Sequence, residues 1–273
     1  MSKMKVLNYL QGGNSTPLII EEDGNKRLVK LTAGMSGAYS VLSEWIGNKL
    51  GQELGINTRI PQWINLTHQL EYSHVNIEIR DLIEKSLGLN ISFDYLENPE
   101  EINLIDLDSF TKSDYINAYL LDVFMLNIDR TEFNINLMRT KDASLLFSDF
   151  ESSLIFNELL SVQTLTTNPG IFGCLKGNPF YQKVPEQNLE QFIEQLNEVD
   201  FDTLIATIPT EIIDALLKQR ILEALNVRKE NNWALRPLLM AIDNTHLETE
   251  EEKNKRIRTN REQLEQRIKQ SNK

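Results

Sequence analysis

One stretch, residues 126–150, constrains this chain more than any other. It begins "LNIDRTEFN", continues through an apolar segment and a short charged turn, and ends "LLFSDF". Asp129 and Asn134 are separated by four residues, and Asp149 follows a strand-like run over 144–147. A phosphoryl-transfer site needs such a set: one carboxylate orients the attacking hydroxyl, while an amide and a second carboxylate hold Mg²⁺. Taken singly, these residues also suit a turn cap, a loop and a strand end.

The N-terminal segment favours a phosphoryl-transfer site over unrelated turn and loop residues. Residues 11–17, "QGGNSTP", place two adjacent glycines before small polar residues, which permits positive φ and close approach of the backbone. We expect strands over 18–20 and 27–31, joined by a turn at 22–25. Lys30 lies in the second of these strands, on the face opposite its two apolar neighbours. A glycine-rich hairpin followed by a strand lysine is typical of a phosphate-binding lobe, although an ordinary hairpin and a solvent-facing lysine have the same pattern.

An amphipathic helix is predicted after this hairpin. Apolar residues recur at helical spacing from Val41 to Leu54, with Ser36 and Ser40 as candidate caps. Gly51 and Gly55 mark its end, and a strand over 63–66 follows. Glu44 lies in this helix, 14 residues after Lys30, where an acid would hold the strand lysine toward the phosphates. A surface position that aids solubility is the alternative for Glu44.

The rest of the chain is predicted to be mainly helical. A helix over 113–127, capped by Ser113 or Asp114, leads directly into Asp129. Residues 67–112 are harder to interpret, and 160–185 contain the Thr, Asn, Gly and Pro residues of a loop. Further helices are expected at 189–196, 212–225 and 233–242. We therefore expect an N-terminal lobe over 1–66, a helical lobe over 67–244, and a charged helical or disordered tail over 245–273.

Composition limits the class of protein. The formal net charge is −12, and no Lys/Arg cluster precedes the last 25 residues, so direct binding to nucleic acid is disfavoured. The single cysteine, Cys174, excludes an intrachain disulfide and fits a reducing compartment. The N-terminus lacks the apolar length of a signal peptide, and no apolar run has the length of a membrane span. We expect a cytoplasmic protein without membrane contact.

Taken in order, these motifs resemble the HipA-like serine/threonine kinases, a bacterial branch of the protein-kinase-like fold. The resemblance rests on "GGNSTPLII" followed by a glycine turn and "VK", on a Glu-bearing helix ending "LGI" before a proline, and on Asn-x-Asp-Arg-x-x-x-Asn over 127–134. It covers roughly residues 8–240. Glu151 stands where many kinases have Gly, and Ile128 where ordinary protein kinases have His. The chain starts close to the glycine-rich loop, so we expect a short form without an extra N-terminal domain.

The resemblance implies a fold and a set of roles. The expected fold is α+β and two-lobed, with a small β-rich N-terminal lobe that carries one helix and a larger, mainly helical C-terminal lobe. Catalysis would use ATP and Mg²⁺, with Lys30 on the phosphates, Glu44 holding Lys30, Asp129 orienting the substrate hydroxyl, and Asn134 and Asp149 binding the metal. The nucleotide would also contact Gly12, Gly13, Asn14 and Ser15. Ser15 and Thr16 are candidate autophosphorylation sites, and unmodified loop hydroxyls are the alternative.

Three functions remain open from the sequence. The first is a kinase for Ser/Thr hydroxyls of a protein, acting in a toxin–antitoxin-type or regulatory system with an antitoxin-like or regulatory partner. The second is a catalytically silent nucleotide-binding module that works by binding a partner. The third is a small-molecule kinase on the same fold, because a fold does not choose its substrate.

Overall fold

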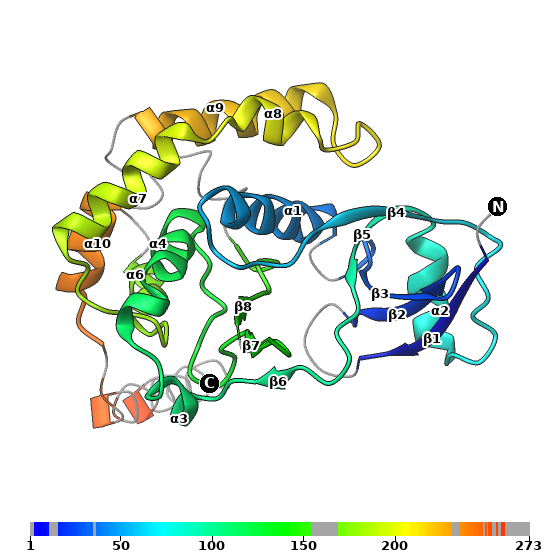
Figure 1. Cartoon of the computed structure of the whole chain (residues 1–273), viewed down its shortest axis with the longest axis horizontal. Coiled ribbons are helices and arrows are strands. Elements are labelled where there is room, and N and C mark those ends of the chain that lie inside the picture. Colours follow the sequence, from blue (N-terminus) through cyan, green and yellow to red (C-terminus); the bar gives the residue numbers. More distant parts are fainter. Residues whose placement is uncertain are drawn as a thin grey trace, which may run out of the picture.

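An antiparallel sheet of five strands forms the N-terminal part of the chain (Figure 1). The computed structural model describes residues 3–10, 16–34, 37–142, 144–153, 169–230 and 235–247, with a few single positions from 249 to 259. The strands lie in the order β1-β2-β3-β5-β4. Their bounds are β1 Met4–Tyr9, β2 Leu18–Glu22, β3 Asn25–Lys30, β4 Gln62–Leu66 and β5 Gly88–Asp94.

The predicted hairpin between β2 and β3 is confirmed. Glu22 pairs with Asn25, and the two residues between them, Asp23 and Gly24, have φ angles of 49° and 86°. A two-residue turn with both φ angles positive matches the right-handed twist of antiparallel strands. This turn sets the register that places Lys30 on the face of the sheet opposite Val29.

The two faces of the sheet have different partners. Val29 and Leu31 belong to an apolar cluster that also contains residues of helix α2, Ile77–Lys85. Because side chains alternate along a strand, Leu28 and Lys30 face the other side. There the sheet contacts helix α1, Ala38–Glu53, through β5. One face therefore forms a local core, while the other is turned toward the C-terminal part of the chain.

The sheet continues beyond Leu66, the expected end of the first lobe. Strand β5 lies between β3 and β4, and α2 precedes it in the chain. Four consecutive residues of β5, from Asn90 to Phe93, are buried, so the strand lacks the alternation that makes a half-exposed strand recognisable. We propose that the first lobe extends to Asp94.

Helix α1 connects the two parts of the chain. It lies between the sheet and the helices in Figure 1, and it contacts β5, helix α4 (Ile116–Met125) and helix α8 (Phe201–Ala206). Gly37, with φ 61°, is its N-cap. Ser36 lies outside the described residues, and Ser40 is not the cap, because its hydroxyl donates back to the Gly37 carbonyl. Gly55, with φ 70°, follows the helix end as predicted, whereas Gly51 lies inside the helix.

The C-terminal part packs helices around α4. Its remaining elements are β6 Glu100–Glu101, α3 Leu104–Leu107, η1 Lys112–Asp114, β7 Leu137–Arg139, β8 Leu145–Phe147, α6 Pro169–Lys176, α7 Glu186–Glu198, α9 Ala215–Glu230 and α10 Leu235–Asn244. Strands β6, β7 and β8 form a second, three-stranded antiparallel sheet. One apolar cluster joins α1 and β5 to α4, α6, α7, α8, α9 and α10. The residues before and after β8 are therefore held between the two parts of the chain.

Two expectations for this part were wrong. The loop predicted over 160–185 contains α6, whose Ile171 and Leu175 are buried; a proline in the first helical turn is compatible with a helix and misled the prediction. The cap of α4 is Tyr115, while Thr111 and Asp114 form a capping box for η1. Most of the charged tail lies outside the described residues. Among those described, no helix has the length and apolar character to cross a membrane.

Candidate active site

A cavity of about 560 Å³ lies between the two parts of the chain. Its charged side includes Lys30 from β3, Glu44 from α1 and Asp149 from the segment after β8. Asn134 also lines it, from the loop between α4 and β7. Four of the residues singled out from the sequence therefore meet at one cavity, although they come from four separate segments.

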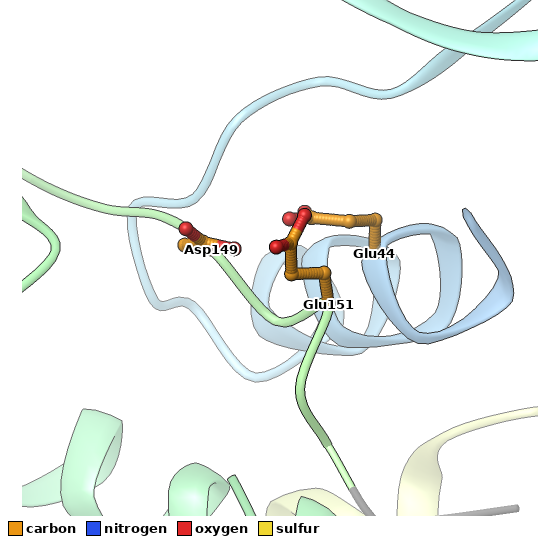
Figure 2. A group of neighbouring side chains, drawn as sticks. All are labelled: Glu44, Asp149 and Glu151. Atoms are coloured by element: carbon orange, nitrogen blue, oxygen red, sulfur yellow. The ribbon is translucent and has the colours of Figure 1, made fainter. Parts of the chain in front are cut away.

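Lys30 is surrounded by three carboxylates. Its Nζ donates a hydrogen bond to Glu44 Oε1, and it lies 2.9 Å from Asp149 Oδ1 and 3.0 Å from Glu151 Oε2. Figure 2 shows Glu151 and Asp149 approaching Glu44 from the same chain segment. Burial opposes the charged form of Lys30, but Asp149, Glu44 and Glu151 outweigh this effect and raise the pKa of the ammonium. Lys30 is therefore a permanent cation in an acidic surrounding.

Glu44 is fixed by α1 and by the segment after β8. Asn48, one turn later in α1, donates to Glu44 Oε2 at 2.8 Å. The backbone N–H of Phe150 donates to Glu44 Oε1 at 3.2 Å. Burial raises the pKa of Glu44, with Lys30 acting in the opposite direction. This acid is thus buried and hydrogen-bonded, and the interpretation of Glu44 as a solubilising surface residue is wrong.

Asp149 has an unusual backbone conformation. Its φ is 67°, in the left-handed region that non-glycine residues rarely occupy. Its carbonyl accepts a hydrogen bond from Asn127 Nδ2 at 3.3 Å. Burial opposes ionisation of the Asp149 carboxyl, but Lys30 outweighs it and the pKa falls below the ordinary value. The surrounding contacts therefore hold a charged carboxylate at the cavity wall in a backbone conformation of higher energy.

Asp129 and Asn134 are direct partners. Asn134 Nδ2 donates to Asp129 Oδ2 at 3.0 Å and to the Asp129 carbonyl at 3.3 Å. With its nitrogen turned toward Asp129, the amide of Asn134 leaves its own side-chain oxygen for another ligand. Burial raises the pKa of Asp129, and the charges of Asp149 and Glu151 raise it further. A carboxylate with a raised pKa is a better proton acceptor, as a general base requires.

Arg130, next to Asp129, organises the loop from inside. Its side chain is 1% exposed, and its Nε donates to Asp122 Oδ2 at 2.7 Å. The same guanidinium donates to the carbonyls of Ile135, Asn136 and Ser148 at 2.7, 3.0 and 3.2 Å. It therefore ties the loop that carries Asn134 to the residue before Asp149.

Asp122 of α4 completes this buried network. In addition to the hydrogen bond from Arg130, its carboxylate accepts hydrogen bonds from Asn127 at 2.9 Å and from Asn178 at 2.8 Å. Its four neighbours in the chain on either side are apolar or small, so only the spacing Asp122-x-x-x-x-Asn127 signals the role in the sequence. No function was predicted for Asp122, Arg130 or Asn178. Asn178 is 56 residues from Asp122 in the chain, so no local pattern connects the two.

The acidic residues around Lys30 fit a divalent cation. Carboxylate oxygens of Glu44, Asp149 and Glu151 lie within 4.8 Å of one another. Mg²⁺ prefers oxygen ligands, which Asp149 and the side-chain oxygen of Asn134 could supply. Because one buried and two partly buried acids face one lysine, added positive charge would also relieve their repulsion. The predicted metal ligands Asn134 and Asp149 are consistent with this chemistry, and Glu151 was not foreseen.

The glycine-rich loop is described only at its ends. Gly12, Gly13, Asn14 and Ser15 lie outside the described residues. Leu10 N donates to the Pro17 carbonyl at 2.9 Å, and both residues line the cavity. Thr16, the residue before Pro17, has a φ of 42°. The two ends of the predicted loop therefore stand at the cavity, as a phosphate-covering loop requires.

Comparison with known proteins gives the chain a family. A family profile described as HipA-like kinase matches residues 4–232. The chain is similar to a solved structure of the Helicobacter pylori proinflammatory kinase CtkA, with a TM-score of 0.54, 11% sequence identity, and coverage of 90% of this chain and 98% of that chain. MAP kinase LmaMPK10 from Leishmania major matches with a TM-score of 0.28 and 10% identity, over 89% of this chain and 87% of that one. None of the curated proteins compared with the chain matches it.

The similarity to CtkA shows the fold, which is the α+β protein-kinase-like fold predicted from the sequence. The profile covers well over half of the 273 residues. On this evidence, the chain belongs to the HipA-like kinase family.

Proposed function

We propose that the protein is an ATP- and Mg²⁺-dependent kinase that transfers the γ-phosphate to a Ser or Thr hydroxyl of a protein. The observation that carries this proposal is the meeting of Lys30, Glu44 and Asp149 at one cavity, with Asn134 on the same wall. Phosphoryl transfer needs little covalent help, so a set of residues that positions the phosphates and neutralises their charge supports catalysis.

Each residue has a role that follows from its contacts. Lys30 binds the nucleotide phosphates, and Glu44 keeps its ammonium at the cavity. Asp129 orients the acceptor hydroxyl and takes its proton, while Asn134 steadies Asp129 and, with Asp149, holds Mg²⁺. When bound, Mg²⁺ neutralises the charge of the phosphate oxygens.

Autophosphorylation of the glycine-rich loop belongs to the same proposal. Ser15 and Thr16 immediately precede Pro17 in the sequence, and Pro17 lines the cavity. A phosphate on either residue adds about −1.5 to −2 charges next to the site for the nucleotide phosphates, and repulsion would weaken nucleotide binding. Modification would then switch the enzyme off. An antitoxin-like or regulatory partner protein is the second form of control that we propose, by analogy with the family.

One observation favours a second candidate function. Glu151 contacts Lys30 at 3.0 Å, so a third carboxylate competes with phosphates for this ammonium. A nucleotide-binding module without turnover, acting through a partner protein, would tolerate such competition. A kinase would need the nucleotide and metal to displace it.

Incubation of the purified protein with Mg-ATP, followed by intact-mass spectrometry, tests the proposal. The Asp149→Ala variant is the matched control. A gain of one phosphate mass in the wild type and none in the variant is expected, and peptide mapping then tests Ser15 and Thr16. Nucleotide binding without phosphate on the protein, on an added protein substrate or on a metabolite supports the silent module. Absence of nucleotide binding refutes both functions.

A further inference from the structure

The cavity has a charged end and an apolar end. Lys30 and Leu28 lie on the same face of β3, and they pair across to Ile91 and Phe93 of β5. Two residues along a strand span roughly 7 Å. The Leu28–Phe93 pair therefore stands about that far from Lys30 along the sheet. Phosphates bound at Lys30, as the proposed function requires, place the base of the nucleotide toward this second pair.

The apolar end suits a flat ring. Leu28 and Phe93 line the cavity from the sheet, while Ile102 and Leu137 line it from the C-terminal part. Apolar side chains above and below a site can hold any purine or pyrimidine, because every base has a π-face. Polar groups at the edge of the ring must therefore decide which base is preferred.

Arg59 supplies these polar groups. It lies in the segment between α1 and β4, and its backbone N–H donates to Asn48 Oδ1 at 3.0 Å. Its guanidinium carbon lies 4.9 Å from the centre of the Phe93 ring. The side chain lines the cavity, although no motif in the sequence singled it out. Burial lowers the pKa of Arg59 to about 10, so the guanidinium stays charged at neutral pH.

The hydrogen bonds of Arg59 leave the site rich in donors. Its Nη2 donates to the backbone carbonyl of Asp94 at 2.5 Å. This hydrogen bond engages a carbonyl at the start of the segment that connects the two parts of the chain. Among the described residues, this is the one hydrogen bond of the guanidinium, which has five N–H groups in all. A base edge that reaches Arg59 therefore meets donors, and a carbonyl on that edge suits them better than an amino group.

We propose that Arg59 is a specificity-determining residue that reads position 6 of the purine, so that the site accepts 6-oxopurine nucleoside triphosphates at least as well as ATP. The proposal rests on the proposed function, because it takes nucleotide phosphates at Lys30 as its starting point. Arginine commonly donates to the O6 and N7 acceptors of guanine. The 6-amino group of adenine meets the charged guanidinium and an Asp94 carbonyl that is already engaged.

Binding of Mg-ATP and Mg-ITP to the wild-type protein, measured by calorimetry, provides the test. The two nucleotides differ at position 6 and are otherwise alike, and Mg-GTP is a second 6-oxo probe. We expect the wild type to bind Mg-ITP at least as tightly as Mg-ATP. Arg59→Met should lower the ratio of ITP to ATP affinity about tenfold, in the range of one lost bidentate contact. Arg59→Lys keeps the charge and should lower this ratio as well.

Arg27→Met is the matched control. Arg27 also contacts Asp94: its Nη1 lies 2.6 Å from Oδ1 of the Asp94 carboxylate. Arg27 does not line the cavity. Its substitution should leave the ratio unchanged. Each ratio is measured within one protein, so a general loss of folded protein cancels.

Three results would overturn the proposal. The first is tighter binding of ATP than of ITP by the wild-type protein. This result overturns the proposal even if the Arg59 variants fail to fold. Equal weakening of both nucleotides in Arg59→Met would show that Arg59 contacts phosphate or ribose. That result refutes the inference alone, because the protein still binds ATP. Absence of binding for all nucleotides refutes the proposed function together with this inference.

Discussion

Gly47 of α1 packs directly against the ring of Phe150, the residue that follows Asp149. A Cβ added at Gly47 would lie 2.7 Å from Phe150 Cβ and 2.8 Å from Phe150 Cδ1, closer than carbon atoms approach. Phe150 is 1% exposed and its N–H also donates to Glu44. The helix that carries Glu44 and the segment that carries Asp149 are thus held together at this contact.

Gly47→Ala should therefore reduce phosphate transfer at least tenfold. The added methyl group displaces Phe150, and Asp149 moves with it away from Lys30. Single-turnover rates and thermal unfolding would measure the effect. Gly173→Ala in α6 is the control, because no other described part of the chain, the helix's own backbone aside, comes within 4 Å of a Cβ there. It should leave the rate unchanged and add up to about 1 kcal/mol of helix stability. Wild-type turnover in Gly47→Ala would contradict the argument.

Asp129→Ala should separate turnover from nucleotide binding. Loss of a general base lowers the rate by about 10²–10⁴-fold. Asp129 does not line the cavity that takes the nucleotide, so the Kd for Mg-ATP should change little. Asp149→Ala should abolish both turnover and the Mg²⁺ dependence of nucleotide binding. Unchanged turnover in Asp129→Ala would refute its assignment.

Arg130→Met should destabilise the protein by about 3–5 kcal/mol, because it leaves the buried carboxylate of Asp122 without its cation. Both side chains of this pair are 1% exposed. Urea unfolding would measure the change. Arg139→Met is the control: Arg139 pairs with Glu100 at 3.3 Å in a partly exposed position, and such pairs contribute about 0–1 kcal/mol. Equal losses in the two variants would contradict the importance of burial.

Arg228→Met should stabilise the protein by about 1–3 kcal/mol. Arg228 is 3% exposed, and its three nitrogen atoms find no hydrogen-bond partner in the part of the chain that the structure describes. Its guanidinium lies over the Phe124 ring at 5.1 Å, which only partly compensates. Arg220→Met, at an exposed position of the same helix, should change stability by less than about 0.5 kcal/mol.

The gain from Arg228→Met should also depend on pH. Burial lowers the pKa of Arg228 to about 9, while the unfolded chain keeps the ordinary, higher value. Above pH 9 the unfolded state therefore binds more protons, and the contribution of Arg228 to stability rises with pH. The difference in free energy of unfolding between variant and wild type should be constant below pH 8 and shrink from pH 8 to pH 10. A difference that grows over this range would refute the assignment.

Local patterns were sufficient for much of the fold. The turn at Asp23 and Gly24, the helix that carries Glu44, and the strand before Asp149 follow from turn chemistry and side-chain periodicity, which act over a few residues. Strand β5 and helix α6 were missed because a strand buried on both faces loses its alternation, and glycine and proline within a helix suggest a loop. The boundary expected at Leu66 did not take β5 into account, and β5 is the reason why we propose that the first lobe extends to Asp94.

Local sequence patterns were enough to predict the residue types of the candidate site and the elements that carry two of them, Lys30 on a strand and Glu44 on a helix. They also singled out Asp129, Asn134 and Asp149 by their spacing. The tertiary structure alone decided that Glu151 joins Lys30, that Asp122 and Arg130 brace the loop, and that Arg59 enters the cavity. Arg59 and Phe93 are far apart in the chain, as are Lys30 and Glu151. Contacts of this kind come from the packing of α1 and the sheet against the C-terminal helices, and no short-range pattern encodes them.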